Sequence, residues 1–129
     1  MKKTVSLLLV CIVALFLAVS GSARWIDIGG IDNTFKVSGR TASIEADVNL
    51  SSNNDCSMIV ELQRYDGRWR TVEDWGPIEG QGGCGMTAKR ALSSGYQYRV
   101  YLTITVTDHR TGAVIETVRN ASDNQPFVE

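Results

Sequence analysis

Histidine and cysteine, on which many metal centres and nucleophilic active sites depend, are scarce in this chain. Its 129 residues include one histidine, His109, and three cysteines, with no Cys-x-x-Cys pair. Cys56 and Cys84 with one distant histidine cannot complete a tetrahedral metal site. There is also no Gly-x-Ser-x-Gly elbow and no phosphate-binding glycine loop. The sequence therefore predicts a protein without catalytic, cofactor-binding or metal-binding residues, in which His109 is a solvated turn residue.

The chain also lacks an excess of positive charge. It has 13 lysine and arginine residues against 14 aspartate and glutamate residues. Removal of a leader that contains Lys2 and Lys3 lowers the basic count to 11 and leaves a mildly acidic remainder. Nucleic acid and anionic membrane surfaces are therefore not the expected partners, because both attract basic proteins.

Residues 1–23 have the order of a secretory signal peptide. Two lysines provide a positive start, residues 5–19 are almost wholly apolar, and three small residues follow. This order predicts cleavage after Ala23, with Ala18 as the alternative. The apolar run is about 15 residues, whereas about 20 are needed to span a bilayer, so a retained membrane anchor is the less favoured interpretation. The sequence thus predicts a secreted, extracellular protein with no membrane span in the mature chain.

Cys56 and Cys84 are the only cysteines outside this leader, which contains Cys11. Two thiols in an exported domain are best interpreted as one disulfide, because the compartment oxidises them. On chain-entropy arithmetic such a crosslink contributes roughly 3 to 4 kcal/mol to stability. A metal pair or a redox pair is the alternative, and neither has a supporting motif.

Apolar residues beyond residue 23 recur with a period of two, and no amphipathic helix pattern is present. In residues 41–50 and 96–107 the alternation is complete. It predicts two strands with one face on a core and the other face in water. Weaker alternation predicts further strands around residues 35–37, 56–62, 68–75, 84–92 and 114–118.

About seven short strands separated by turns predict an all-β fold, an immunoglobulin-like two-sheet antiparallel sandwich at residues 35–122. Residues 24–34 are expected to be an N-terminal extension or an extra strand, and residues 123–129 a C-terminal tail. In such a sandwich the third and fifth strands run in the same direction. Cys56 and Cys84 begin these two strands, so the disulfide is expected to join the two sheets at one end.

Short motifs in the middle of the chain carry a family resemblance. They are Leu62-Gln63-Arg64-Tyr65, Gly67-Arg68-Trp69, Val72, Trp75 and Gly95-Tyr96-Gln97-Tyr98-Arg99-Val100. Over roughly residues 35–122 the chain resembles a family of short secreted immunoglobulin-like proteins of Gram-positive bacteria, whose function is uncharacterised. The resemblance implies a bacterial, secreted β-sandwich and brings no catalytic or binding residues.

The segment Tyr98-Arg99-Val100 is also similar to the Tyr-x-Cys of immunoglobulin strand F, whose tyrosine packs at a corner. Val100 stands where antibody domains have a cysteine, and no tryptophan lies on the third predicted strand. The resemblance to antibody domains is therefore architectural, without their usual disulfide between the sheets.

Trp69 and Trp75 are the most informative candidates for a ligand surface. They lie six residues apart in one predicted strand, an even spacing that places both on one face, with Thr71 between them. Two exposed rings would offer a platform for sugar rings or for a partner protein. The favoured alternative is that both rings pack over the edge of the core. The glycine-rich segment 76–85, which includes Gln81, is expected to be a mobile loop, either for recognition or as a plain connection between the sheets.

The sequence as a whole favours a secreted, non-catalytic binding or interaction module. Its candidate ligand surface comprises Trp69, Thr71, Trp75 and Gln81, and its expected partner is an extracellular glycan or protein. The alternatives are a secreted inhibitor or effector that acts through the 76–85 loop, and a purely structural exported domain. Edge strands could also pair with a neighbouring copy, so a monomer and an oligomer are both compatible with the sequence.

Overall fold

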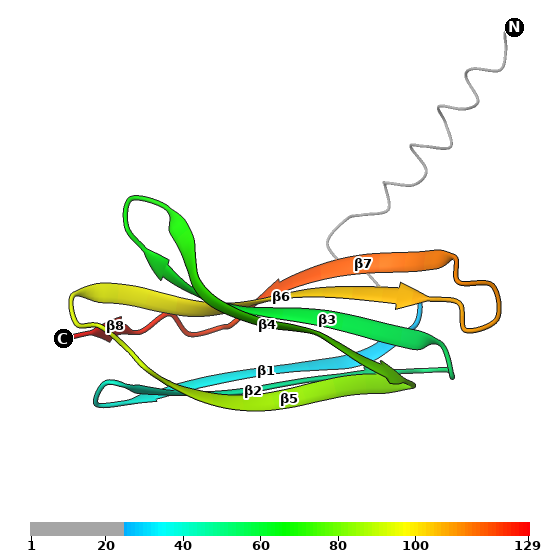
Figure 1. Ribbon diagram of the computed structural model, residues 1–129, viewed down its shortest axis with the longest axis horizontal. Coiled ribbons are helices and arrows are strands. Elements are labelled where there is room, and N and C mark those ends of the chain that lie inside the picture. The colour runs from blue at the N-terminus through cyan, green and yellow to red at the C-terminus, as the bar shows by residue number, and fades with distance from the viewer. Residues whose placement is uncertain (1–24) are drawn as a thin grey trace, which may run out of the picture.

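The computed structural model describes residues 25–129, which form eight β-strands in two stacked layers (Figure 1). The predicted signal peptide, residues 1–23, lies outside the described residues. Within residues 25–129 no helix is long and apolar enough to span a membrane. The strands are β1 (Ile28–Ser38), β2 (Thr41–Leu50), β3 (Asp55–Tyr65), β4 (Trp69–Gln81), β5 (Gly83–Ala91), β6 (Tyr96–Thr107), β7 (Val114–Ala121) and β8 (Phe127–Val128).

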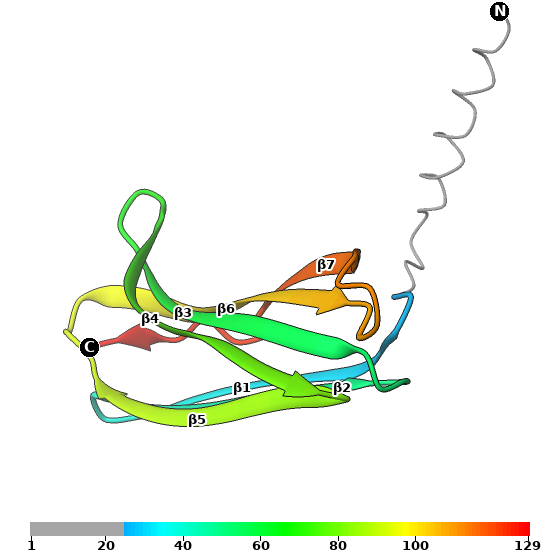
Figure 2. The same cartoon turned by 45° about the vertical axis from the view of Figure 1, so that its right-hand side comes forward.

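The eight strands of residues 25–129 are divided between two antiparallel sheets. The smaller sheet has the order β1-β2-β5, and the larger has the order β4-β3-β6-β7 with β8 also paired to β6. β8 pairs with the start of β6 and β7 with its remainder, so together they form one edge. Figures 1 and 2 show the two sheets packed face to face. This arrangement confirms the predicted all-β, immunoglobulin-like two-sheet antiparallel sandwich.

β2 and β6 begin and end at the residues that the alternation predicts. Most of their even-numbered side chains point between the sheets and are almost fully buried, while the odd-numbered ones face outward. Burial of each large aliphatic side chain contributes about 1.5–3 kcal/mol. The core therefore consists mainly of alternate residues of β2, β3 and β6, namely Ala42, Ile44, Ala46, Val48, Met58, Val60, Leu62, Val100, Leu102, Ile104 and Val106.

The opening strand β1 starts at Ile28, earlier than the predicted strand around Phe35, and includes most of the segment expected as an extension. Backbone N–H groups of residues 26–28 donate to the carboxylate of Glu116 at 2.9, 2.7 and 3.3 Å. These bonds attach the start of the described chain to β7 in the other sheet.

A tyrosine corner joins the β5–β6 connection to the core. The Tyr98 side chain is 2 % exposed. Its hydroxyl donates to the carbonyl oxygen of Ser93 and accepts the N–H of Ser93, both at 3.1 Å. This is the contact that the similarity to immunoglobulin strand F implies. Val100, at the cysteine position of that motif, is fully buried in the core.

The glycine-rich segment 76–85 is not the expected mobile loop. β4 continues through it to Gln81 and β5 starts at Gly83, so only Gly82 lies between the two strands. The Gly82 N–H donates to the Asn54 carbonyl oxygen at 2.9 Å, and the Gly82 oxygen accepts the N–H of Leu50 at 3.0 Å. A Cβ on Gly83 would collide with the Val48 carbonyl oxygen. The glycines therefore permit a tight crossing from the larger sheet to the smaller one. This agrees with the alternative prediction, in which the segment is a plain connection between the sheets.

Cys56 and Cys84 lie at the same end of the sandwich, in different sheets, as predicted. Each is the second residue of its strand, and their Sγ atoms are 2.8 Å apart. This distance is longer than a disulfide bond, and both residues are thiols in this structure. The hydrogen bond between them lowers the pKa of Cys56 and raises that of Cys84, which burial raises further.

Candidate functional site

A β-bulge in β4 separates the two tryptophans that the sequence places on one face. Two successive residues of β3 pair with β4 residues that are two apart, which leaves Val72 as an extra residue. An extra residue reverses the side-chain alternation beyond it. Trp69 and Thr71 therefore point outward whereas Trp75 points between the sheets. The predicted common face of Trp69 and Trp75 is wrong.

Trp75 packs against the core of the sandwich. It lies opposite Val60, whose side chain is fully buried, and is itself partly buried against the core cluster. An aromatic ring contributes most when it is removed from water. For Trp75, the core-packing interpretation is therefore the one that the geometry supports.

Trp69 lies on the outer face of the larger sheet, in contact with an arginine and a tyrosine. The Cζ atom of Arg99 is 4.4 Å from the centroid of the Trp69 ring and 4.9 Å from that of the Tyr101 ring. Tyr65 meets Trp69 edge to face, with 5.3 Å between centroids and 68° between planes, and is 45 % exposed. A guanidinium over an exposed ring is attracted by roughly 0.5–1 kcal/mol. We call Tyr65, Trp69, Arg99 and Tyr101 the aromatic face.

A short chain of hydrogen bonds holds the aromatic face in place. The Arg99 Nε donates to Gln63 Oε1 at 2.7 Å, and the Gln63 Nε2 donates to Glu61 Oε1 at 3.1 Å. The Thr71 hydroxyl donates to the same Glu61 oxygen. The amide of Gln63 is almost buried, with 8 % of the residue exposed. Arg99 is thus fixed on three sides, by Gln63 and by two rings, before any ligand arrives.

The aromatic face lies beside the β3–β4 hairpin, whose tip projects away from the sandwich (Figure 2). Two exposed arginines, Arg68 and Arg70, flank the turn, against one carboxylate, Asp66. The only ion pair at the tip among the described residues joins Arg70 Nε to Asp66 Oδ2 at 3.6 Å, with both side chains about half exposed. This end of an otherwise mildly acidic protein is therefore locally positive.

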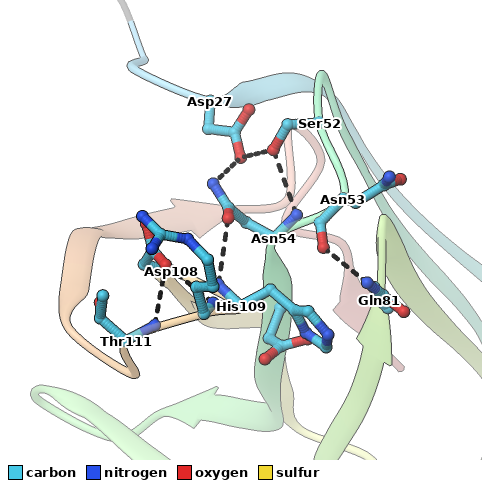
Figure 3. Close-up of polar contacts among 10 residues, drawn as sticks. Asp27, Ser52, Asn53, Asn54, Gln81, Asp108, His109 and Thr111 are labelled. Carbon is cyan, nitrogen blue, oxygen red and sulfur yellow. Dashed lines mark hydrogen bonds and ion pairs between the residues drawn. The ribbon is translucent and has the colours of Figure 1, made fainter.

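Gln81, the fourth predicted surface residue, lies at the opposite end of β4 from Trp69. Its Nε2 donates to the Asn53 carbonyl oxygen at 3.0 Å, as Figure 3 shows. Asp27 in the same cluster accepts from Ser52 Oγ at 2.7 Å and from Asn54 Nδ2 at 3.1 Å. These bonds order the β2–β3 loop. Gln81 therefore fixes a loop and does not share a surface with Trp69 and Thr71.

His109 lies in the β6–β7 turn beside this loop (Figure 3). Its Nδ1 is 2.9 Å from Asp55 Oδ1, and its side chain is 57 % exposed. Asp108 Oδ1 accepts the N–H groups of Thr111 and Arg110 at 2.9 and 2.8 Å, and these bonds lower the pKa of Asp108. The arrangement is that of a stabilised turn. Among residues 25–129, the hydrogen bonds of His109 are those to Asn54 and Asp55.

Three carboxylates gather on the outer face of the smaller sheet. Ligand oxygens of Asp32, Glu45 and Asp47 lie within 4.8 Å of one another, and the Asp32 carboxylate accepts the Thr34 hydroxyl at 2.7 Å. Two of the three residues are exposed. Carboxylate oxygens can bind hard cations such as Ca²⁺. An exposed acidic group of this kind is common on protein surfaces and is not by itself a metal site.

Sequence reasoning missed three of the four residues of the aromatic face. The alternation along β6 does place Arg99 and Tyr101 on the outer side, and the hairpin motif contains Tyr65. What the pattern does not give is the register, in which Gln63 is opposite Arg99 and Tyr65 is opposite Trp69. Only this register brings the four side chains together.

Fold and site together define an immunoglobulin-like sandwich with an ordered aromatic and arginine cluster on one sheet. No family model matches the chain, and no curated protein is significantly similar to it. The resemblance to secreted immunoglobulin-like proteins of Gram-positive bacteria therefore stays a prediction from the motifs.

Proposed function

We propose that this chain is an exported, non-catalytic binding module that recognises a partner protein through the aromatic face. Export rests on the leader predicted at residues 1–23. Recognition rests on one observation above all, the half-buried stack of Trp69, Arg99 and Tyr101 on the outer face of the sheet, with the exposed Tyr65 at its edge. Tryptophan, tyrosine and arginine are the residues most often found at the energetic centres of protein interfaces.

The geometry favours a protein over a sugar as the ligand. Sugar rings stack on a free aromatic face, but one face of Trp69 and one of Tyr101 are covered by the Arg99 guanidinium. Tyr65 occupies further space next to Trp69. What the cluster offers to a ligand is a rigid, amphipathic surface, which loses little conformational entropy on binding. The arginines of the adjacent hairpin favour an acidic surface on the partner.

The proposal includes a disulfide between Cys56 and Cys84 in the exported protein. The two sulfurs already touch across the sheets, so oxidation requires little movement. Peptide mapping of the secreted product tests this step. A peptide that links residues 56 and 84 is expected, and free thiols at both positions would contradict it.

The inhibitor alternative loses its basis in the fold. It relied on a mobile, disulfide-anchored loop at residues 76–85, and this segment lies in β4 and β5 apart from Gly82. β4 is paired with β3 and β5 with β2, so the segment does not extend into the active site of a protease as a free loop can.

Binding to intact producing cells and to their secreted proteins tests the proposed function. The exported protein is compared with the variants Trp69→Ala and Arg99→Met, and with Lys89→Met as a matched control. Lys89 is an exposed cation on the smaller sheet, so its variant removes the same charge as Arg99→Met but leaves the aromatic face intact. We expect both aromatic-face variants to lose at least tenfold in affinity and the control to bind as the wild type does.

Treatment of the binding material before the assay separates the ligand classes. Protease digestion is expected to abolish binding, and periodate oxidation of sugars is expected to leave it intact. Binding that survives protease and disappears after periodate would assign a glycan ligand and refute the proposed protein partner. Equal binding by wild type, Trp69→Ala and Arg99→Met would refute the role of the aromatic face.

A further inference from the structure

A small polar cavity lies between the two sheets at the end opposite the cysteines. Its volume is about 30 Å³, and its lining includes Arg64, Arg90, Ser93 and Tyr98. Arg64 belongs to β3 in the larger sheet and Arg90 to β5 in the smaller sheet. Both occupy even-numbered positions of their strands, which point toward the partner sheet. Two guanidinium groups from opposite sheets therefore meet at one cavity.

Each guanidinium has one buried donor without an acceptor. Arg64 Nε and Arg90 Nη1 are buried, and neither has a hydrogen-bond partner among residues 25–129. The rest of each group is held elsewhere. Arg90 Nε lies 3.1 Å from Glu73 Oε1, and the Arg64 Cζ lies 4.2 Å from the centroid of the Tyr96 ring. Buried N–H groups in folded proteins are nearly always paired, so an unpaired donor on each of two arginines that line one cavity indicates a guest that accepts hydrogen bonds.

The two arginines of the lining offer only hydrogen-bond donors. The Tyr98 hydroxyl gives its hydrogen to the Ser93 carbonyl oxygen and accepts the Ser93 N–H, so these groups satisfy each other. Glu73 is the one carboxylate in contact with the two arginines among the described residues, which leaves a net positive charge at the cavity. A water molecule needs acceptors for its own two hydrogens, whereas a simple anion needs only donors.

We propose that this cavity binds a monatomic anion of the size of chloride, held between Arg64 and Arg90. The volume fits a single guest of about the size of a water molecule. The anion completes the hydrogen bonding of both buried donors. It also balances the positive charge of the second guanidinium, which Glu73 leaves uncompensated. It also bridges the two sheets at the end opposite the cysteine pair. Because it binds only the folded chain, it stabilises the fold by mass action.

Thermal unfolding at constant ionic strength tests the proposal, with chloride replaced stepwise by gluconate, which is too large for the cavity. The exported protein is expected to unfold at a higher temperature as chloride rises, with a saturating dependence. The variants Arg64→Met and Arg90→Met are expected to lose this dependence. Arg68→Met removes the same charge from the exposed tip of the hairpin and is expected to keep it. An unfolding temperature that does not respond to the exchange, or a response that Arg68→Met also loses, would overturn the proposal.

A direct measurement covers the case in which an arginine variant does not fold. Crystals of the wild-type protein grown in bromide are expected to show an anomalous peak within hydrogen-bonding distance of Arg64 Nε and Arg90 Nη1. Line broadening of the chloride nuclear magnetic resonance signal by wild-type protein, reversed by bromide, reports the same site in solution. A well-ordered water at this position in crystals grown in high bromide would refute the anion.

Discussion

The Tyr98 hydroxyl is the single group whose removal tests the fold most sharply. Tyr98→Phe deletes one oxygen from a side chain that is 2 % exposed and leaves the ring in place. Two hydrogen bonds at 3.1 Å are lost, one to the carbonyl and one from the N–H of Ser93. Each bond contributes about 0.5–1.5 kcal/mol, so we expect the free energy of unfolding to fall by roughly 2 kcal/mol.

Urea unfolding followed by tryptophan fluorescence measures this loss. A change in the native contacts alone lowers the midpoint and leaves the slope m unchanged. In a thermal scan the same loss corresponds to a decrease of about 8–16 °C, since each kcal/mol shifts the midpoint by roughly 4–8 °C in a domain of this size. Tyr65→Phe is the matched control. Its residue is 45 % exposed, so we expect a change of no more than about 0.5 kcal/mol.

The tyrosine corner would be refuted by equal effects of the two substitutions. A loss below about 0.5 kcal/mol for Tyr98→Phe would mean that water replaces the hydroxyl at no cost, which is incompatible with a buried group. A change in m would instead mean that the substitution alters the unfolded state or the two-state behaviour. Either result would mean that the Tyr98 hydroxyl does not have the role of the tyrosine in the immunoglobulin corner motif.

Three further substitutions probe the core, the turn and the cysteine pair. Leu102→Ala, at a fully buried site, is expected to lower the free energy of unfolding by about 2–5 kcal/mol in the same urea assay, and a loss under 1 kcal/mol would contradict the packing. The pKa of Asp108 lies below its ordinary value, so its carboxylate stabilises the fold above the unfolded pKa and this contribution is lost as the pH falls through the folded pKa. Asp108→Asn should therefore flatten the decline of stability in acid, measured by unfolding at a series of pH values below 5. In the oxidised secreted protein, replacing Cys56 and Cys84 together by serine should cost roughly 3–4 kcal/mol, and reduction of the wild type should cost a similar amount.

Alternation of side chains made the strands predictable, because a strand with one buried face must repeat every two residues. β2 and β6 follow this rule without interruption, and their bounds agree with the sequence prediction. The tyrosine corner was also recognisable, since Tyr98 stands in a short motif with one structural role. These features depend on local order along the chain, which the sequence contains directly.

The aromatic face was not predictable in the same way, because it depends on register and on a bulge. One extra residue, Val72, turns Trp75 inward, and nothing in the residues around it distinguishes a bulged strand from a regular one. The expectation of a mobile loop at residues 76–85 is wrong for a related reason. Glycine serves both mobile loops and close approaches of backbone. Only the close approach of the Val48 carbonyl oxygen to Gly83 shows that the segment requires space for its backbone and not mobility.

The same alternation places the aromatic face and the anion cavity on opposite faces of the same two strands, β3 and β6. In β6 the outward Arg99 follows the inward Tyr98, and in β3 the outward Tyr65 follows the inward Arg64. Neighbouring residues on opposite faces do not touch the same ligand. Arg99→Met is therefore expected to weaken partner binding and leave the chloride dependence of unfolding unchanged. Arg90→Met, on the smaller sheet, is expected to abolish the chloride dependence and leave partner binding intact. If each variant lost both partner binding and the chloride dependence of unfolding, the two sites would be one. Neither the binding surface nor the anion site would then be correctly assigned.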